Sequence, residues 1–112
     1  MKIQCHCANI VIEVDKPARV TQCNCSICSR YHSLWGYYAP EQVKIFIGAS
    51  GSDSYAWGDK ELDFVRCSDC GCVTHYQTQP GQGTPRVAVN FGMDRKAVND
   101  VPIRYFDGAK EL

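Results

Sequence analysis

Eight cysteines constrain this sequence more than any other feature, and they fall into three tight clusters. The clusters are Cys5-x-Cys7, Cys23-x-Cys25-x-x-Cys28 and Cys67-x-x-Cys70-x-Cys72. Each short spacing lets two or three sulfur atoms converge on one point, as a metal ion requires. Clusters far apart in the sequence can also close a shared site. The pattern therefore predicts zinc bound by cysteine.

Disulfide bonds are the main alternative use for so many cysteines. The N-terminal segment has no apolar stretch typical of a signal peptide, which predicts a cytoplasmic protein. A reducing compartment keeps thiols free and so favours metal binding over disulfides. A bond within Cys5-x-Cys7 or within Cys23-x-Cys25 would also be strained.

Length and charge limit the number of domains and the class of partner. With 112 residues the chain is long enough for one domain and too short for two ordinary ones, so residues 1–112 are expected to form a single zinc-binding domain. Basic and acidic residues both number 12, which gives a formal net charge of zero and no basic patch for nucleic acid. No segment approaches the roughly 18 apolar residues of a membrane-spanning helix. The oligomeric state stays open.

Short alternating segments predict a mostly β fold. Turn residues bound several runs of β-branched and aromatic residues, and no segment carries a sustained helical period. The expected strands are residues 10–14, 19–22, 34–38, 43–47, 62–66, 73–77, 86–91 and 101–106. Residues 48–51 are expected to form a loop, 58–60 a turn and 93–99 at most one helical turn. The third cluster then lies at a hairpin tip, where Gly71 permits a positive φ.

Zinc chemistry gives the clusters different expected roles. A structural zinc site fills all four tetrahedral positions with protein ligands, as a pairing of Cys5-x-Cys7 with Cys67-x-x-Cys70 would do. Folding would then require the metal. The central cluster offers only three thiols, which leaves a fourth position for water or for a thiol substrate. The spacing alone leaves open which clusters pair.

The same motifs carry a family resemblance over nearly the whole chain. The cysteine motifs, Tyr55-x-Trp-Gly-Asp59 ahead of Cys67-x-x-Cys70-Gly71, and the closing Ile103-Arg-Tyr-Phe-Asp-Gly108 resemble the family of glutathione-dependent formaldehyde-activating enzyme and centromere protein V. The resemblance implies a β-tent-like fold of small antiparallel sheets built around two zinc ions per chain. It implies a structural zinc held by Cys5, Cys7, Cys67 and Cys70, and a catalytic zinc held by Cys23, Cys25 and Cys28.

The resemblance also implies an activity. In the better-understood members, the open zinc site engages the thiol of glutathione and forms or cleaves its adduct with formaldehyde. We therefore expect a zinc-dependent carbon–sulfur lyase acting on a thiol–aldehyde adduct of the S-hydroxymethylglutathione type, with the three central cysteines acting through the bound zinc. The physiological thiol and the electrophile stay open. Two other functions compete: a non-catalytic zinc module for protein binding, and a thiol or zinc redox sensor.

Cys72 departs from the family pattern, which usually has a small or polar residue at this position. Its thiol can close the central site as a fourth ligand, serve as a labile or redox thiol, or pack in the core. Core packing is the favoured interpretation. A fourth thiol at the central site would argue against catalysis.

Other residues near the clusters have a structural and a functional interpretation. The histidines His6, His32 and His75 can ligate a metal or, for His32, act as an acid or base, but surface or core positions are favoured. The aromatic residues Trp35, Tyr37, Tyr38, Tyr55 and Trp57 can line a substrate pocket, although ordinary packing is favoured. Arg30 and Arg66 can bind carboxylates of a glutathione-like tripeptide or offset thiolate charge.

Overall fold

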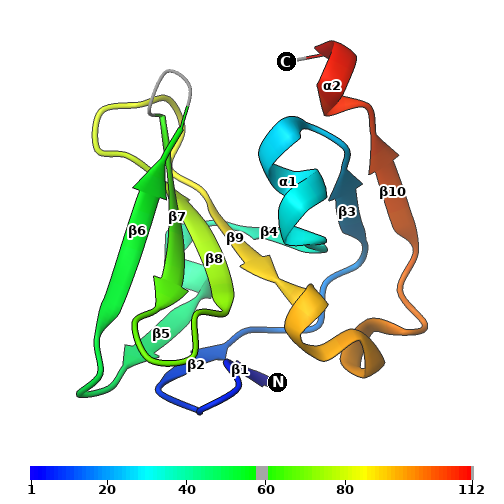
Figure 1. Ribbon diagram of the computed structural model, residues 1–112. Coiled ribbons are helices and arrows are strands. Elements are labelled where there is room, and N and C mark those ends of the chain that lie inside the picture. The colour runs from blue at the N-terminus through cyan, green and yellow to red at the C-terminus, as the bar shows by residue number, and fades with distance from the viewer. Residues whose placement is uncertain (58–60, 112) are drawn as a thin grey trace.

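The computed structural model describes residues 1–57 and 61–111, which form a three-stranded and a seven-stranded β-sheet (Figure 1). The small sheet has the order β1 (Lys2–Gln4), β2 (Ile10–Glu13), β5 (Lys44–Ile47). The large sheet has the order β10 (Ile103–Phe106), β3 (Val20–Cys23), β4 (Trp35–Tyr38), β9 (Val87–Asn90), β8 (Val73–Thr78), β7 (Leu62–Cys67), β6 (Ser52–Ala56). The helices are α1 (Ser26–Tyr31), α2 (Gly108–Glu111) and two 3₁₀ segments, Pro40–Gln42 and Phe91–Val98.

The expectation of a mostly β fold made of small sheets is confirmed, and every expected strand is present within two residues of its expected limits. All described strand pairs are antiparallel except β10 with β3, which run parallel. The turn expected at residues 58–60 lies outside the described residues. None of the helices in the described segments has the length and apolar character needed to cross a membrane.

Several elements differ from the sequence expectation, among them helix α2, the 3₁₀ segment Pro40–Gln42, and the segment Phe91–Val98, which is longer than the single turn expected at 93–99. Strand β1 and strand β6 were not expected, because β1 has only three residues and β6 is exposed at all but one of its positions and shows no apolar alternation. Helix α1 spans six residues inside the central cysteine cluster. This is under two helical turns, too short for a 3.6-residue period to become visible.

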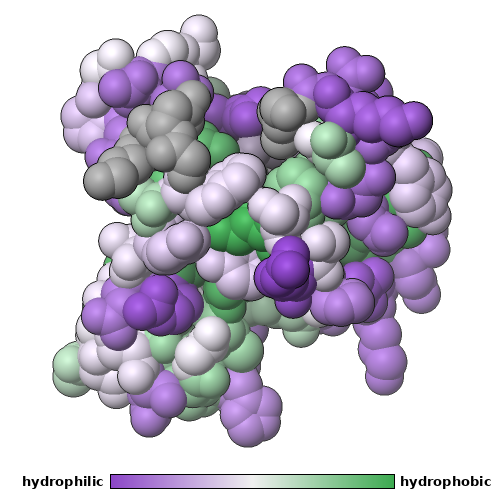
Figure 2. Space-filling model, turned by 45° about the horizontal axis from the view of Figure 1, so that its top comes forward, coloured by the Kyte–Doolittle hydropathy of each residue, from purple (hydrophilic) through white to green (hydrophobic). Residues whose placement is uncertain are grey.

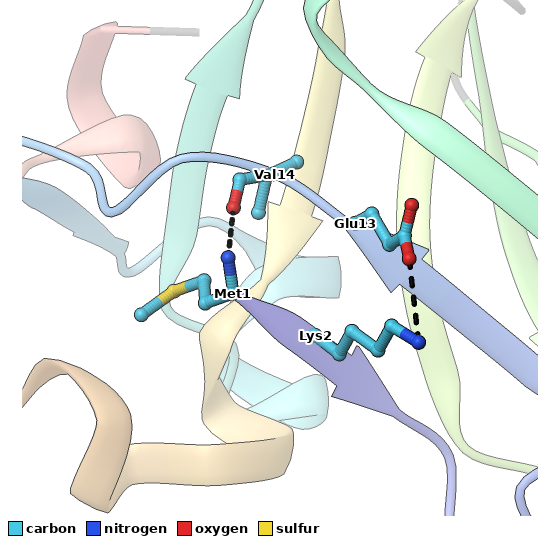
Figure 3. A network of polar contacts seen from close by, with 4 residues as sticks. All are labelled: Met1, Lys2, Glu13 and Val14. Atoms are coloured by element: carbon cyan, nitrogen blue, oxygen red, sulfur yellow. Dashed lines mark hydrogen bonds and ion pairs between the residues drawn. The ribbon is translucent and has the colours of Figure 1, made fainter.

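The N-terminal residue is tied into the small sheet (Figure 3). The ammonium group of Met1 donates to the carbonyl of Val14 at 2.7 Å, and Lys2 forms an ion pair with Glu13 at 3.4 Å. This ion pair is largely solvent-exposed and contributes at most about 1 kcal/mol. Burial of Ile10 and Ile12, whose side chains are fully shielded, contributes more, roughly 1.5–3 kcal/mol each.

The large sheet is buried on both faces around β9, and each face packs in a different hydrophobic core. Val87 and Val89 join the core that the small sheet covers, together with Phe91. Between them, Ala88 points to the opposite side and packs with Trp35 and other residues around the central cysteines. Because successive side chains of a strand alternate between faces, β9 separates a closed structural core from the side that carries the candidate site.

Asn90 connects three strands beside the hydrophobic core that contains Trp35 and Ala88. Its side-chain oxygen accepts from the backbone N–H groups of Leu34 at 3.2 Å and Gly92 at 2.9 Å. Its amide group donates to the carbonyl of Val73 at 2.8 Å. One buried side chain therefore fixes the start of β4, the end of β9 and the start of β8 relative to one another.

We predict that Asn90→Ala lowers the free energy of unfolding by about 1–3 kcal/mol, because buried backbone groups lose their partners. Denaturant unfolding monitored by circular dichroism measures the change. Asn99→Ala is the matched control, since Asn99 is exposed and its side chain makes no hydrogen bond within the described residues. The control should stay within about 0.5 kcal/mol of the unmodified protein. Equal effects of the two substitutions would contradict the role given to Asn90.

Candidate metal centres

Four cysteines from two turns lie together at the junction of the small and large sheets, and we call them the outer cluster. Their sulfur atoms all lie within 4.8 Å of one another, and the cluster consists of Cys5, Cys7, Cys67 and Cys70. The sulfur of Cys7 is 3.8 Å from that of Cys5 and 3.5 Å from that of Cys67. In a tetrahedral zinc site with Zn–S bonds of about 2.3 Å, two sulfur atoms are about 3.8 Å apart. The spacing of these sulfur atoms therefore suits one zinc ion.

The turns that carry the outer cluster direct backbone N–H groups at the sulfur atoms. The N–H of Ile10 donates to Cys5 at 3.2 Å, and the N–H of Asp69 donates to Cys67 at 3.4 Å. Backbone N–H groups of Cys72 and Cys7 lower the pKa of Cys70 to about 5. Gly71 has a φ of 79°, as expected for the tight turn between β7 and β8. These hydrogen bonds lower the pKa of Cys67 and Cys70 and so favour their thiolates, the form in which cysteine binds metal.

Cys72 lies beside the outer cluster and away from the central one. Burial raises the pKa of its thiol, while the backbone N–H of His6 and the Cys70 thiol are its neighbours. The thiol is half-buried and packs against the core that contains Cys5 and Cys67. This placement agrees with the core-packing interpretation, and the Cys72 side chain does not close the central site.

The histidines do not join either group of cysteines within residues 1–57 and 61–111. His75 is buried on β8, and its Nδ1 forms a hydrogen bond with Thr74 Oγ1 at 2.8 Å. Burial lowers the pKa of His75 to about 4, so its ring is neutral at physiological pH. His32 ends α1 in a left-handed conformation, and His6 is exposed between two cysteines. The described geometry gives these residues structural or surface positions.

The other three cysteines form the central cluster at the junction of β3 and α1. Cys23 ends β3, Cys25 caps the N-terminus of α1, and Cys28 lies in its first turn. The Cys25 sulfur accepts from the backbone N–H of Cys28 at 3.4 Å, in the way that a serine or aspartate oxygen usually caps a helix. The three sulfur atoms lie within 4.8 Å of one another. The Cys-x-x-Cys spacing therefore serves both as a helix cap and as a pair of metal donors.

Hydrogen bonds distinguish the three central thiols from one another. Burial raises the pKa of Cys28 to about 12, although the indole N–H of Trp35 opposes this effect by donating to its sulfur at 3.3 Å. Burial also acts to raise the pKa of Cys25, but hydrogen bonds from the backbone N–H of Cys28 and from the neighbouring thiols outweigh it and lower the pKa. Trp35 is only 1% exposed, so its hydrogen bond to the Cys28 sulfur is shielded from water.

The central cluster opens into a cavity of about 410 Å³, which we call the aromatic cavity. Its described walls contain the three central cysteines, together with the aromatic residues Trp35, Tyr37, Trp57, Phe64, Tyr76 and Phe106. Ile27, Leu62, Glu61 and Arg86 complete these walls. Figure 2 shows hydrophobic surface in the middle of this side of the molecule, between more hydrophilic flanks. The three central cysteines are buried, at 4–8% exposure, and they line a largely apolar cavity.

Strand register explains why so many aromatic residues share one wall. Tyr37 on β4, Ala88 on β9, Tyr76 on β8 and Phe64 on β7 are successive cross-strand partners, so they form one row on one face of the sheet. Trp35 lies on the same face two residues before Tyr37 and packs edge-on against Tyr76, with ring centroids 4.8 Å apart. We call the aromatic residues of this row, together with Trp35, the aromatic floor; they line the same cavity as the three central cysteines.

Part of this cavity was predictable from the sequence. Of the five aromatic residues singled out there, Trp35, Tyr37 and Trp57 line it. Tyr38 instead points into the opposite core, where its hydroxyl donates to the carbonyl of Asp15 at 2.7 Å. Tyr55 is 48% exposed on the edge strand β6. Neither of these two tyrosines is part of the described walls.

The described walls of the cavity contain neither of the two arginines singled out in the sequence. Arg86, and not Arg30 or Arg66, is the arginine in the described walls of the cavity. Arg30 is instead held within α1, where its Nη1 donates to the carbonyl of Ser26 at 2.6 Å. Arg30 and Arg66 lie next to cysteine motifs in the sequence, which is why they were candidates. Arg86 reaches the site through strand pairing between β8 and β9, which no local motif signals.

Comparison with known proteins agrees with this geometry. The crystal structure of a protein from Rhodobacter sphaeroides matches 93% of this chain and 100% of its own, with 25% sequence identity and a TM-score of 0.74. The family model of glutathione-dependent formaldehyde-activating enzyme matches residues 1–103, a range that contains both groups of cysteines. These matches confirm the resemblance found in the sequence, and the chain belongs to the family of glutathione-dependent formaldehyde-activating enzyme.

Proposed function

We propose that this protein is a zinc-dependent carbon–sulfur lyase acting on a thiol–aldehyde adduct of the S-hydroxymethylglutathione type. The observation that carries the proposal is that the three central cysteines line an open cavity and converge from one side. Three protein donors leave one tetrahedral position, as in catalytic zinc sites. The family's name supports glutathione as the thiol and formaldehyde as the aldehyde.

The two groups of cysteines take different roles in this proposal. The outer cluster of Cys5, Cys7, Cys67 and Cys70 holds a structural zinc with four protein ligands. The central cluster of Cys23, Cys25 and Cys28 holds the catalytic zinc. Because Cys72 lies beside the outer cluster, the fourth position at the central cluster stays available for the substrate sulfur.

The reaction breaks the carbon–sulfur bond of the adduct. A zinc ion at the central cluster would hold the substrate sulfur and stabilise it as a thiolate leaving group. The hydroxyl proton of the adduct leaves to water at the open mouth of the cavity, the hydroxyl oxygen becomes the aldehyde oxygen, and the electron pair of the broken bond stays on sulfur. In the reverse direction the thiolate attacks the aldehyde carbon, and water returns the proton to the oxygen.

The chain's own residues prepare the site for this chemistry. The backbone N–H groups of Cys25 and Cys28 donate to the sulfur atoms of Cys23 and Cys25 at 3.5 and 3.4 Å. With the indole of Trp35 on the Cys28 sulfur, each central sulfur has at least one hydrogen-bond donor from the chain. The aromatic floor replaces water around the reacting carbon with apolar side chains. Such preorganisation strengthens electrostatic interactions at the reacting atoms.

Zinc content is the first test. We predict two zinc ions per chain by elemental analysis, of which one is removed by mild chelation and protected by glutathione. Cys25→Ser should lose this labile zinc and the lyase activity while keeping the fold. Cys67→Ser should yield no soluble folded protein, because structural zinc binding is worth roughly 10–16 kcal/mol against a net stability of about 5–15 kcal/mol.

Cys72→Ser is the matched control for these substitutions, since Cys72 lies outside both groups of converging sulfur atoms. The control should keep both zinc ions and full activity. Two zinc ions that both resist chelation would contradict an open central site. Identical behaviour of Cys25→Ser and Cys67→Ser would contradict the division into catalytic and structural clusters.

The Trp35 indole provides a second test. We predict that Trp35→Phe weakens zinc binding at the central cluster by roughly tenfold or more, because groups that hydrogen-bond to metal ligands typically have effects of this size. Competition with a coloured chelator measures the affinity. The outer cluster is the internal control, and its zinc should be unaffected. Equal weakening at both clusters would indicate general destabilisation instead of a lost N–H···S bond.

A further inference from the structure

Arg86 lies where the aromatic cavity meets a second cavity. The second cavity has a volume of about 570 Å³ and shares four described wall residues with the aromatic cavity: Tyr37, Glu61, Leu62 and Arg86. A ligand whose sulfur reaches the central cysteines therefore has room to extend past Arg86. The guanidinium group is the positively charged group that both sets of described walls contain.

Strand pairing directs Arg86 toward the cysteine side of the large sheet. Just before β9, its backbone N–H donates to Thr78 Oγ1 at 3.0 Å and its carbonyl accepts from the Thr78 N–H at 3.0 Å. Arg86 precedes Ala88 by two residues, so the two side chains lie on the same face. Ala88 is a cross-strand partner of both Tyr37 and Tyr76, which belong to the aromatic floor.

The head of Arg86 is held in place although the residue is exposed. Its Nη2 donates to the hydroxyl of Tyr76 at 2.8 Å, and its Cζ lies 4.5 Å from the ring centroid of Tyr37. A guanidinium group has five N–H donors, and this hydrogen bond uses one. The ion pairs of the described residues do not include Arg86, so Glu61, which lines the same cavities, forms none with it. Donors remain for an anionic ligand.

A short series of contacts connects Arg86 to the central cluster. The Cys28 sulfur accepts from Trp35, the Trp35 ring packs on Tyr76, and the Tyr76 hydroxyl accepts from Arg86. Two aromatic residues therefore separate the guanidinium group from the nearest sulfur. Arg86 and the three central cysteines also line the same cavity, so one ligand in that cavity can face both.

We infer that Arg86 binds a carboxylate of the thiol substrate and makes the site selective for anionic thiols; the assignment of the bound group as a thiol rests on the proposed function. Arginine pairs with carboxylates through parallel N–H···O bonds in a planar geometry. The chain has a formal net charge of zero, so its overall charge offers no general attraction for anions. Selectivity for a carboxylate therefore depends on this local contact.

Binding of glutathione to the zinc-loaded protein tests this inference when it is compared with binding of the glutathione diester, in which both carboxylates are esterified. The chain has two tryptophans, Trp35 and Trp57, and both line the aromatic cavity, so intrinsic fluorescence reports binding directly. Arg86→Gln should weaken glutathione binding by roughly 10- to 100-fold, as expected for loss of a charge-assisted hydrogen bond, and change diester binding less than about twofold. Arg86→Lys should recover part of the loss.

Arg19→Gln is the matched control, because Arg19 is exposed ahead of β3 and lies outside the described walls of both cavities. It should leave both affinities unchanged. The inference is wrong if Arg86→Gln binds glutathione normally, or if its affinities for glutathione and for the diester fall equally. It is also wrong if the unmodified protein does not bind glutathione more tightly than the diester.

S-methylglutathione separates this inference from the proposed function, since its sulfur carries a methyl group in place of the thiol proton. Its binding should also weaken by roughly tenfold or more in Arg86→Gln, because the carboxylates are unchanged. If the protein has no lyase activity but its binding of these ligands depends on Arg86, the proposed function is wrong and the role of Arg86 still holds. Lyase activity on the glutathione adduct with an unchanged KM in Arg86→Gln would refute the role of Arg86 alone.

Discussion

The convergence of four sulfur atoms from two distant turns is the constraint on which the arrangement of the two sheets depends. Cys5 and Cys7 belong to the turn that joins β1 and β2 of the small sheet, whereas Cys67 and Cys70 belong to the turn between β7 and β8 of the large sheet. The outer cluster therefore connects the two sheets at one point. The buried isoleucines of the small sheet and the valines of β9 then fill the space between the sheets. Because this core covers one face of the large sheet, only the other face remains available for a site.

The central cluster makes use of that second face. Cross-strand partners place Tyr37, Tyr76 and Phe64 in one row, and α1 brings the cysteines opposite it. Cys25 caps the short helix with its sulfur, so a residue that is a candidate metal donor also stabilises the local backbone. A change at Cys25 therefore affects the helix start as well as the donor set. Trp35 connects the two sides, with its ring in the floor and its N–H on the Cys28 sulfur.

Much of this structure is predictable from the sequence, and the failures have physical causes. Strand β2 buries alternate residues and so carries a readable period of two residues, whereas β6 lies at a sheet edge with exposed polar residues and carries none. Cysteine spacing indicates metal, because converging sulfur atoms are a local property. The cavity is not local: Arg86, Phe64 and Tyr76 meet the cysteines only through strand pairing.

Cys72 illustrates the same limit at a single residue. Its spacing from Cys70 is the same as that between Cys5 and Cys7, so sequence alone permits it to be a metal donor at either site. The turn at Gly71, which has a positive φ, precedes Cys72. After this turn the Cys72 thiol lies beside the His6 backbone and the outer cluster. The central group thus keeps three sulfur donors in the described structure. In the proposed enzyme, this backbone turn is what leaves the fourth position to a substrate, and the reactive end of the cavity then differs chemically from the end that contains Arg86. A substitution of a central cysteine and a substitution of Arg86 can therefore alter sulfur binding and carboxylate binding separately, because these residues lie on different elements.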